Sequence, residues 1–253
     1  MAELSQIVDH TNALLRVAEV PDYPPALNGL QLESQSGQVT KIVAAVDACL
    51  PVIEQAIALD ADLLVVHHGL FWSGAQKLVG GQFRKLQIAI ESGLAIYSAH
   101  IPLDIHDEFG NNALMAKALG FEGKSLPILP WKGIHMGRLF ETDQTRDALT
   151  AKVSSAVGAS AHLCPGGPEI VKRVGLCTGG AGSEIASAAA GGVDTFITGE
   201  GQHWTYTLAE ELGVNLIYGG HYATETFGVK ALSAHLAEKF GVAWEFVDHP
   251  TGL

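Results

Sequence analysis

Two adjacent histidines, His67 and His68, directly follow a run of strand-forming aliphatic residues in the stretch DLLVVHHGLFW (62–72). Consecutive Cα atoms are about 3.8 Å apart, and the ions of two-metal sites are roughly 3.5–4 Å apart. Because neighbouring strand residues face opposite ways, a single ion would rarely use both imidazoles. The doublet therefore favours a dinuclear metal site, in which each histidine serves one ion.

Two other segments pair a histidine with a carboxylate four residues later. HYATE places His221 and Glu225 on one face at the start of a predicted helix, where they can hold one divalent ion or bridge two. HIPLD places His100 and Asp104 at the same spacing, but Pro102 disfavours a helix, so we expect this pair on a loop. Imidazole and carboxylate ligands suit Fe, Mn, Zn, Co or Ni better than Mg or Ca.

Predicted strands and helices alternate around these residues. In the first half, strands are predicted at 41–46, 62–66 and 94–99, with helices at 2–17, 51–59, 83–91 and 111–119. In the second half, strands are predicted at 173–177, 194–198, 215–218 and 243–247, with helices at 183–190, 204–212 and 223–240. Continuous aliphatic runs predict strands covered on both faces, and therefore mostly parallel sheets.

The two halves repeat one plan. Positions 42 and 67, and positions 174 and 199, are both 25 residues apart, and each interval holds strand, helix and strand. Each interval is followed by a helix and a strand that ends near a histidine, His100 or His221. The repetition predicts a duplicated α/β unit, although any α/β protein can produce such a coincidence.

Residues capable of chemistry follow four of the predicted strands, in HHG (67–69), SAHIPLDIH (98–106), TGEGQHW (198–204) and GGHYATETF (219–227). Open α/β sheets place functional groups at the carboxyl ends of their strands. We therefore predict that the chain divides into two α/β modules, residues 1–125 and 126–253, with these residues at the strand ends. Glu200 and His203 could orient metal ligands, cap a helix or contact substrate.

Composition excludes several other classes. The net charge of −12, with only 15 scattered Lys and Arg residues, argues against a nucleic-acid surface. Cys49, Cys164 and Cys177 form no CxxC pair, so neither a zinc knuckle nor a disulfide framework is indicated. GGAGSE (179–184) lacks the spacing of a phosphate-binding loop. No apolar run approaches the roughly 20 residues of a membrane span, and no signal peptide is evident, so we expect a cytoplasmic protein.

The stretches PPALNGLQLE, VVHHGLFWSG, SAHIPLDIHDEFGNNALMAKALG, GVDTFITGE and GGHYATETFGVKAL resemble the NIF-three-like family, also called type 2 GTP cyclohydrolase I homologues, in its short bacterial branch. The resemblance implies two interlinked α/β modules, with a dinuclear metal site in the cleft between them, in a ring-shaped homohexamer. It implies His100 as an auxiliary group near the ions and Glu225 as their bridging ligand. The full set of implied ligands is His67, His68, Asp104, His221 and Glu225.

These features favour a metal-dependent hydrolase that uses two divalent ions per chain and acts on an anionic nucleotide, with GTP as the first substrate to test. An activated water would attack an electrophilic carbon such as C8 of the purine, and His100 or Glu200 would transfer protons. The main alternative is a metal-binding regulatory or assembly protein without turnover, because no nucleotide-binding motif is evident. A metallophosphoesterase is the third hypothesis.

Overall fold

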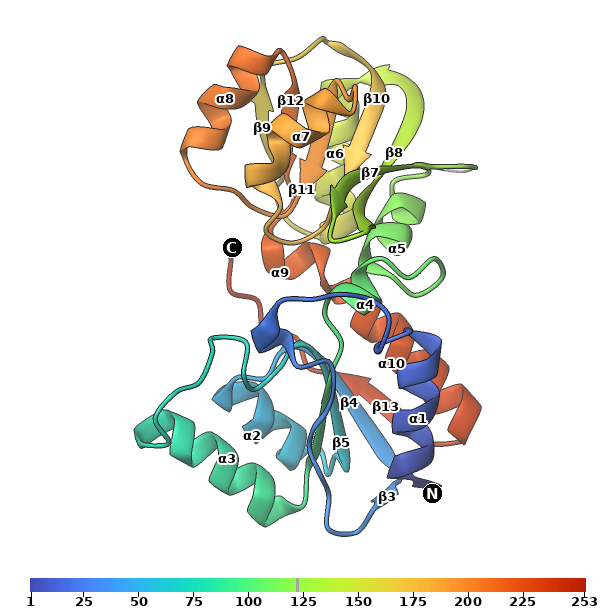
Figure 1. Cartoon of the computed structure of the whole chain (residues 1–253), viewed down its shortest axis with the longest axis vertical. Helices are drawn as coiled ribbons and strands as arrows, with labels where there is room; N and C mark the ends of the chain where they lie inside the picture. The colour runs from blue at the N-terminus through green and yellow to red at the C-terminus, as the bar shows by residue number, and fades with distance from the viewer. Residues whose placement is uncertain (122) are drawn as a thin grey trace. The chain divides into compact units, whose positions relative to one another are not determined.

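The fold is taken from a computed structural model, in which residues 1–121 and 123–253 are described (Figure 1). The chain forms two compact units. The first unit consists of Met1–Leu103 and Gly228–His249, and the second consists of Asp104–Phe227 and Pro250–Leu253. Among the described residues, no helix is both long enough and apolar enough to span a membrane.

The first unit is built on a five-stranded sheet with the strand order β13-β4-β5-β6-β2. Four strands are parallel, and β2 runs antiparallel to β6 at the edge. The strands are β2 (Gly29–Leu32), β4 (Lys41–Asp47), β5 (Leu63–His68), β6 (Ala95–Ser98) and β13 (Ala243–Phe246). A separate antiparallel pair consists of β1 (Ala2–Glu3) and β3 (Gln38–Val39).

Helices cover both faces of this sheet (Figure 1). Residues of α2 (Leu50–Ala58) and α3 (Gly80–Ser92) pack with β4 and β5 in one core cluster, and α1 (Leu4–Leu14) and α10 (Thr226–Phe240) lie on the other face. All six residues of β5 are buried. Burial on both faces explains why this strand reads as an unbroken apolar run up to its two histidines.

The second unit is built on a six-stranded sheet with the order β7-β8-β10-β11-β12-β9. Only β10, β11 and β12 are parallel to one another, and the other pairings are antiparallel. The strands are β7 (Leu126–Trp131), β8 (Ile134–Thr145), β9 (His162–Pro165), β10 (Ile170–Leu176), β11 (Thr195–Thr198) and β12 (Asn215–Tyr218).

Two core clusters use alternate residues of these strands. Phe196 of β11 packs with residues of α7 (Ile185–Ala190) and α8 (Trp204–Leu212). The next residue, Ile197, packs with residues of α5 (Asn111–Ala118) and α6 (Arg146–Val157). Because successive strand residues point to opposite faces, the sheet is buried between two helical layers.

The predicted repetition of element order is confirmed. The first unit contains β4-α2-β5-α3-β6 and the second contains β10-α7-β11-α8-β12, with the three strands parallel in both. The prediction of mostly parallel sheets fits the first unit but is wrong for the second, where three of five pairings are antiparallel. The extra strands β7, β8 and β9 flank the parallel set and account for the difference.

The division into units also differs from the predicted boundary at residues 125 and 126. Met115 and Leu119, in and just after α5, belong to a core of the second unit, whereas β13 pairs with β4 in the first. Asp104 therefore counts with the second unit instead of the first. An apolar helical pattern shows which face of a helix is buried but not which sheet covers it. The sequence therefore does not show that α5 packs in the second unit or that β13 pairs in the first.

We expect Phe196→Ala to lower the free energy of unfolding by about 3–5 kcal/mol, because the fully buried ring leaves a cavity in the second unit. The control is Ile170→Ala, at a side chain that is 44% exposed, with an expected change within about 1 kcal/mol. Urea denaturation measures both. Equal losses would contradict the assignment of Phe196 to the core.

Candidate metal-binding site

A cluster of three buried histidines occupies the carboxyl ends of two strands in the first unit. His67 and His68 end β5, and His100 follows β6 by two residues. One ring nitrogen from each lies within 4.8 Å of the others, and the side chains are 0%, 6% and 7% exposed. Three imidazoles so close together, and so well shielded from water, are a suitable set of transition-metal ligands.

The premise that His67 and His68 face opposite ways is wrong. Their ring centroids are only 4.8 Å apart, with the ring planes inclined by 51°. β5 ends at His68, and strict alternation of side chains holds only within a regular strand. The doublet by itself therefore does not decide between one ion and two.

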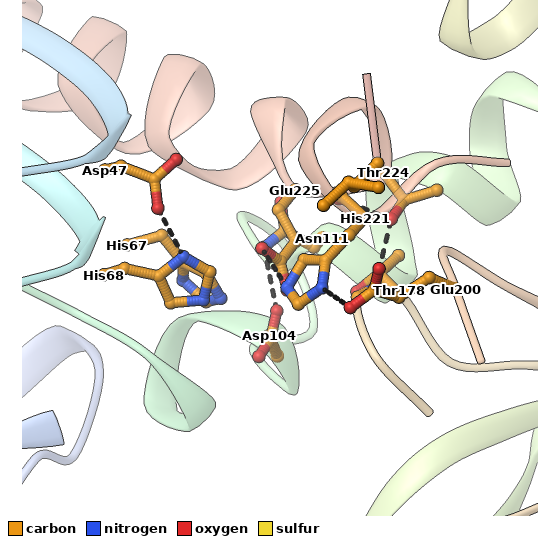
Figure 2. Close-up of polar contacts among 12 residues, drawn as sticks. Asp47, His67, His68, Asp104, Asn111, Thr178, Glu200, His221, Thr224 and Glu225 are labelled. Carbon is orange, nitrogen blue, oxygen red and sulfur yellow. Dashed lines mark hydrogen bonds and ion pairs between the residues drawn. The ribbon is translucent and has the colours of Figure 1, made fainter. Parts of the chain in front are cut away.

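Hydrogen bonds at Nδ1 fix the tautomers of the doublet. His67 Nδ1 lies 2.8 Å from the backbone oxygen of Ala99. His68 Nδ1 lies 2.9 Å from Asp47 Oδ1 (Figure 2). A carbonyl or a carboxylate oxygen can only accept, so in both rings Nδ1 carries the proton. The lone pair is then on Nε2, which is the arrangement found in metal-ligating histidines.

Asp22 holds His100 in the same way. Asp22 Oδ1 accepts from His100 Nδ1 at 2.8 Å, and Oδ2 accepts from the backbone nitrogen of Ile101 at 2.9 Å and from Asn28 at 2.7 Å. Burial alone would raise the pKa of Asp22, but the bonds from His100 and Asn28 and the positive charge that His100 can carry lower it below its usual value. The ionised carboxylate therefore orients the third imidazole.

The second unit contributes a second set of donors. Asp104 and Glu225 are 8% and 3% exposed, and an oxygen of one lies within 4.8 Å of an oxygen of the other. Asp104 accepts a hydrogen bond of 2.8 Å from the buried amide of Asn111, which orients its carboxylate (Figure 2). These are oxygen ligands of the kind that divalent cations accept.

The expected loop at His100–Asp104 is a single helical turn, α4 (Ile101–Asp104), so this prediction is wrong. Pro102 is the second residue of the turn. Proline is tolerated there because the first N–H groups of a helix have no acceptor within it. The turn carries Asp104 to the start of the second unit.

The spacing in HYATE predicts that His221 and Glu225 lie on one face at the start of a helix, and the two side chains do lie together. His221 begins α9 (His221–Thr224), and its Nε2 lies 3.2 Å from Oε2 of Glu225, the residue after the helix. On its other side, His221 Nδ1 lies 2.9 Å from Glu200 Oε1 (Figure 2). Burial would lower the pKa of His221, but the two carboxylates raise it to about 9. Glu200 thus orients the imidazole in the way that Asp47 and Asp22 do in the first unit.

A glycine loop makes room for this donor set. Gly179 has φ of +72°, and a Cβ at this position would overlap Glu225 Oε1. Its backbone nitrogen donates to Thr224 Oγ1 at 3.0 Å, which ties the loop to α9. The GGAGSE segment does not have the spacing of a phosphate-binding loop. Its first glycine instead leaves space for the Glu225 carboxylate, a role that the sequence does not show.

Two further polar residues of the second unit, His203 and Cys177, are not part of the donor clusters found among the described residues. His203 is exposed immediately before α8. Cys177 is buried, and burial together with the carboxylates of Asp104 and Glu225 raises the pKa of its thiol. Its sulfur donates a hydrogen bond of 3.4 Å to the backbone oxygen of Met136.

Comparison with known proteins places the chain in a family. The model of the Duf34/NIF3 (NGG1p interacting factor 3) family matches residues 2–251. The chain belongs to this family. A Deinococcus radiodurans relative named GTP cyclohydrolase 1 type 2 homolog is 38% identical over 250 residues, which cover 98% of this chain and 94% of the relative.

Two solved structures have the same fold as this NIF3-family protein over nearly its whole length. The protein ybgI, described as of unknown function, superposes with a TM-score of 0.91 at 35% identity, covering 99% of this chain and 100% of that one. TTHA1606 from Thermus thermophilus superposes with a TM-score of 0.87 at 38% identity, with the same coverage. The α/β fold with two sheets is thus shared by these relatives.

We expect Gly179→Ala to lower the free energy of unfolding by about 1–3 kcal/mol, because alanine is strained at this positive φ and its Cβ meets Glu225. Gly180→Ala is the matched control, since its Cβ would lie 3.4 Å from His221 Cε1, an ordinary contact, and its expected change is under about 1 kcal/mol. Thermal denaturation of the metal-free proteins compares the two. Equal stability of the two variants would refute the steric role of Gly179.

Proposed function

We propose that the histidines of the first unit and the carboxylate–histidine set of the second bind one pair of divalent metal ions. The proposed ligands are His67, His68, Asp104, His221 and Glu225, with Glu225 bridging the ions. The observation that carries the proposal is the hydrogen bonding of the ligand histidines, each of which has Nδ1 against an oxygen acceptor. A set of imidazoles oriented in this way is typical of metal centres.

The connectivity of the chain supports joint use of the two donor sets. The chain passes from the first unit to the second between Leu103 and Asp104, and returns between Phe227 and Gly228. Asp104 follows His100 by four residues, and four residues span at most about 14 Å even when fully extended. Glu225 lies three residues before the return. Donors of both units therefore flank the points at which the units are covalently joined.

The chemistry of the donors fits Fe, Mn, Zn, Co or Ni. Asp104 and Glu225 supply negative charge that favours a cation, and buried carboxylates require such compensation. Asp47 accepts the Nδ1 hydrogen bond of His68, and Glu200 accepts that of His221. These carboxylates would raise the basicity of the Nε2 atoms of the two rings. When bound, the ions would supply a water of lowered pKa and a positive charge for an anionic substrate.

We propose that this centre hydrolyses a nucleotide, with GTP as the first substrate to test because relatives are named GTP cyclohydrolase 1 type 2 homolog. His100 can accept a proton at Nε2 while Asp22 holds its Nδ1 proton. Glu200 is the second proposed proton-transfer group, since its carboxylate already holds the Nδ1 proton of His221. We also propose that the protein is cytoplasmic and assembles into a ring-shaped homohexamer.

Metal removal tests the hydrolase directly. We expect metal-loaded protein to consume GTP, and both chelated protein and the Asp104→Ala variant to lose at least about 100-fold in rate, because the ions supply the activated water. Asp107→Ala is the nearby control, as the Asp107 side chain is 93% exposed. Chromatography of the nucleotide follows the reaction. Wild-type rates in the metal-free protein or in Asp104→Ala would refute the proposal.

The carboxylate behind His68 gives a separate prediction about metal affinity. We expect Asp47→Ala to weaken binding of Mn²⁺ or Zn²⁺ by about 10- to 100-fold, because His68 loses the acceptor that fixes its tautomer. Asp143→Ala removes a carboxylate that is 75% exposed and should leave affinity unchanged. Calorimetric titration of metal into metal-free protein measures both. Unchanged affinity in Asp47→Ala would show that His68 is not a ligand.

A further inference from the structure

An aromatic corner, formed by Tyr23 and Trp72, lies beside the histidine cluster of the first unit. Trp72 stacks on His68, with ring centroids 4.9 Å apart and planes inclined by 24°, and its centroid is 4.3 Å from that of His100. Tyr23 meets Trp72 at 6.4 Å with the ring planes at 79°. The two rings are thus nearly perpendicular to each other next to the proposed metal ligands.

The corner is open to solvent although the histidines beside it are buried. Tyr23 is 46% exposed, Trp72 is half-buried, and Leu27 nearby in sequence is 54% exposed. Large apolar surface next to a few buried, convergent polar groups is typical of a ligand-binding site.

The corner is also held in a fixed relation to the histidines. The backbone nitrogen of Tyr23 donates to Asp22 Oδ1 at 2.6 Å, and the same oxygen accepts from His100 Nδ1. Trp72 stacks on His68, which Asp47 orients through Nδ1. The Tyr23 backbone and the Trp72 ring are therefore linked to the groups that orient the imidazoles, as a preorganised binding surface requires.

We propose that Tyr23 and Trp72 bind the planar heterocyclic base of the substrate. This inference rests on the proposed function and narrows its substrate to molecules that carry a flat aromatic ring at or next to the atom that reacts. Two perpendicular rings offer a face and an edge, so a flat ring can stack on one while it meets the other edge to face. Stacking of this kind accepts any base and relies little on charge.

The test compares GMP with ribose 5-phosphate, which has the same sugar and phosphate without the base. Calorimetric titrations into the Mn²⁺-loaded full-length protein should show that Tyr23→Leu and Trp72→Leu each weaken GMP binding about tenfold and leave ribose 5-phosphate binding unchanged. Tyr23→Phe should bind GMP like the wild type. Trp204→Leu, at another exposed aromatic residue (48%), is the control and should have no effect.

Equal binding of GMP and ribose 5-phosphate to the wild type would overturn the inference, as would unchanged GMP affinity in both leucine variants. The outcome is separable from that of the proposed function. If GMP binding depends on the base but GTP is not turned over, the hydrolase proposal is refuted and the inference about the aromatic corner stands. Turnover of GTP at unchanged KM in both leucine variants would keep the hydrolase and remove the corner. Because Tyr23 is 46% exposed, its leucine variant should fold even if Trp72→Leu does not.

Discussion

A single kind of hydrogen bond determines what the candidate site can do. His67, His68, His100 and His221 each place Nδ1 against an oxygen atom, from a backbone carbonyl in one case and from a carboxylate in the other three. These acceptors keep the Nδ1 proton in place, so Nε2 is the ring atom that would bind a metal ion. Without these acceptors, the rings could rotate or change tautomer. The ring nitrogen that faces the candidate site would then not be fixed.

The rest of the fold serves to bring these acceptors to the histidines. In the first unit, parallel strands end at one edge, so Asp47 at the end of β4 reaches His68 at the end of β5. In the second unit, Glu200 follows β11 and His221 follows β12, which is the neighbouring parallel strand. The same geometric relation, a carboxylate from one strand end behind an imidazole from the next, therefore occurs in both units.

Much of this arrangement was predictable from the sequence. β12 and α8 have the predicted bounds, because each is a strongly patterned segment between turn residues. The histidine doublet and the four-residue spacing of His221 and Glu225 were visible because their chemistry is local in sequence. Motif spacing also indicated the family, which the full-length match confirms.

What the sequence could not provide depends on tertiary contacts. Asp22 and Asp47 lie 78 and 21 residues from the histidines that they orient, and an aspartate carries no mark of such a distant partner. Strands β7 and β9 were missed because they are irregular or short, and β7 contains two prolines at the edge of its sheet. The role of Gly179 is visible only once Glu225 stands against it.

The most direct test of the central claim is anomalous diffraction from crystals of the full-length protein grown with Mn²⁺. We expect two anomalous peaks per chain, bound through Nε2 of His67, His68 and His221, with a carboxylate of Glu225 between the ions. Peaks bound through Nδ1, or no peak at these side chains at saturating metal, would contradict the claim.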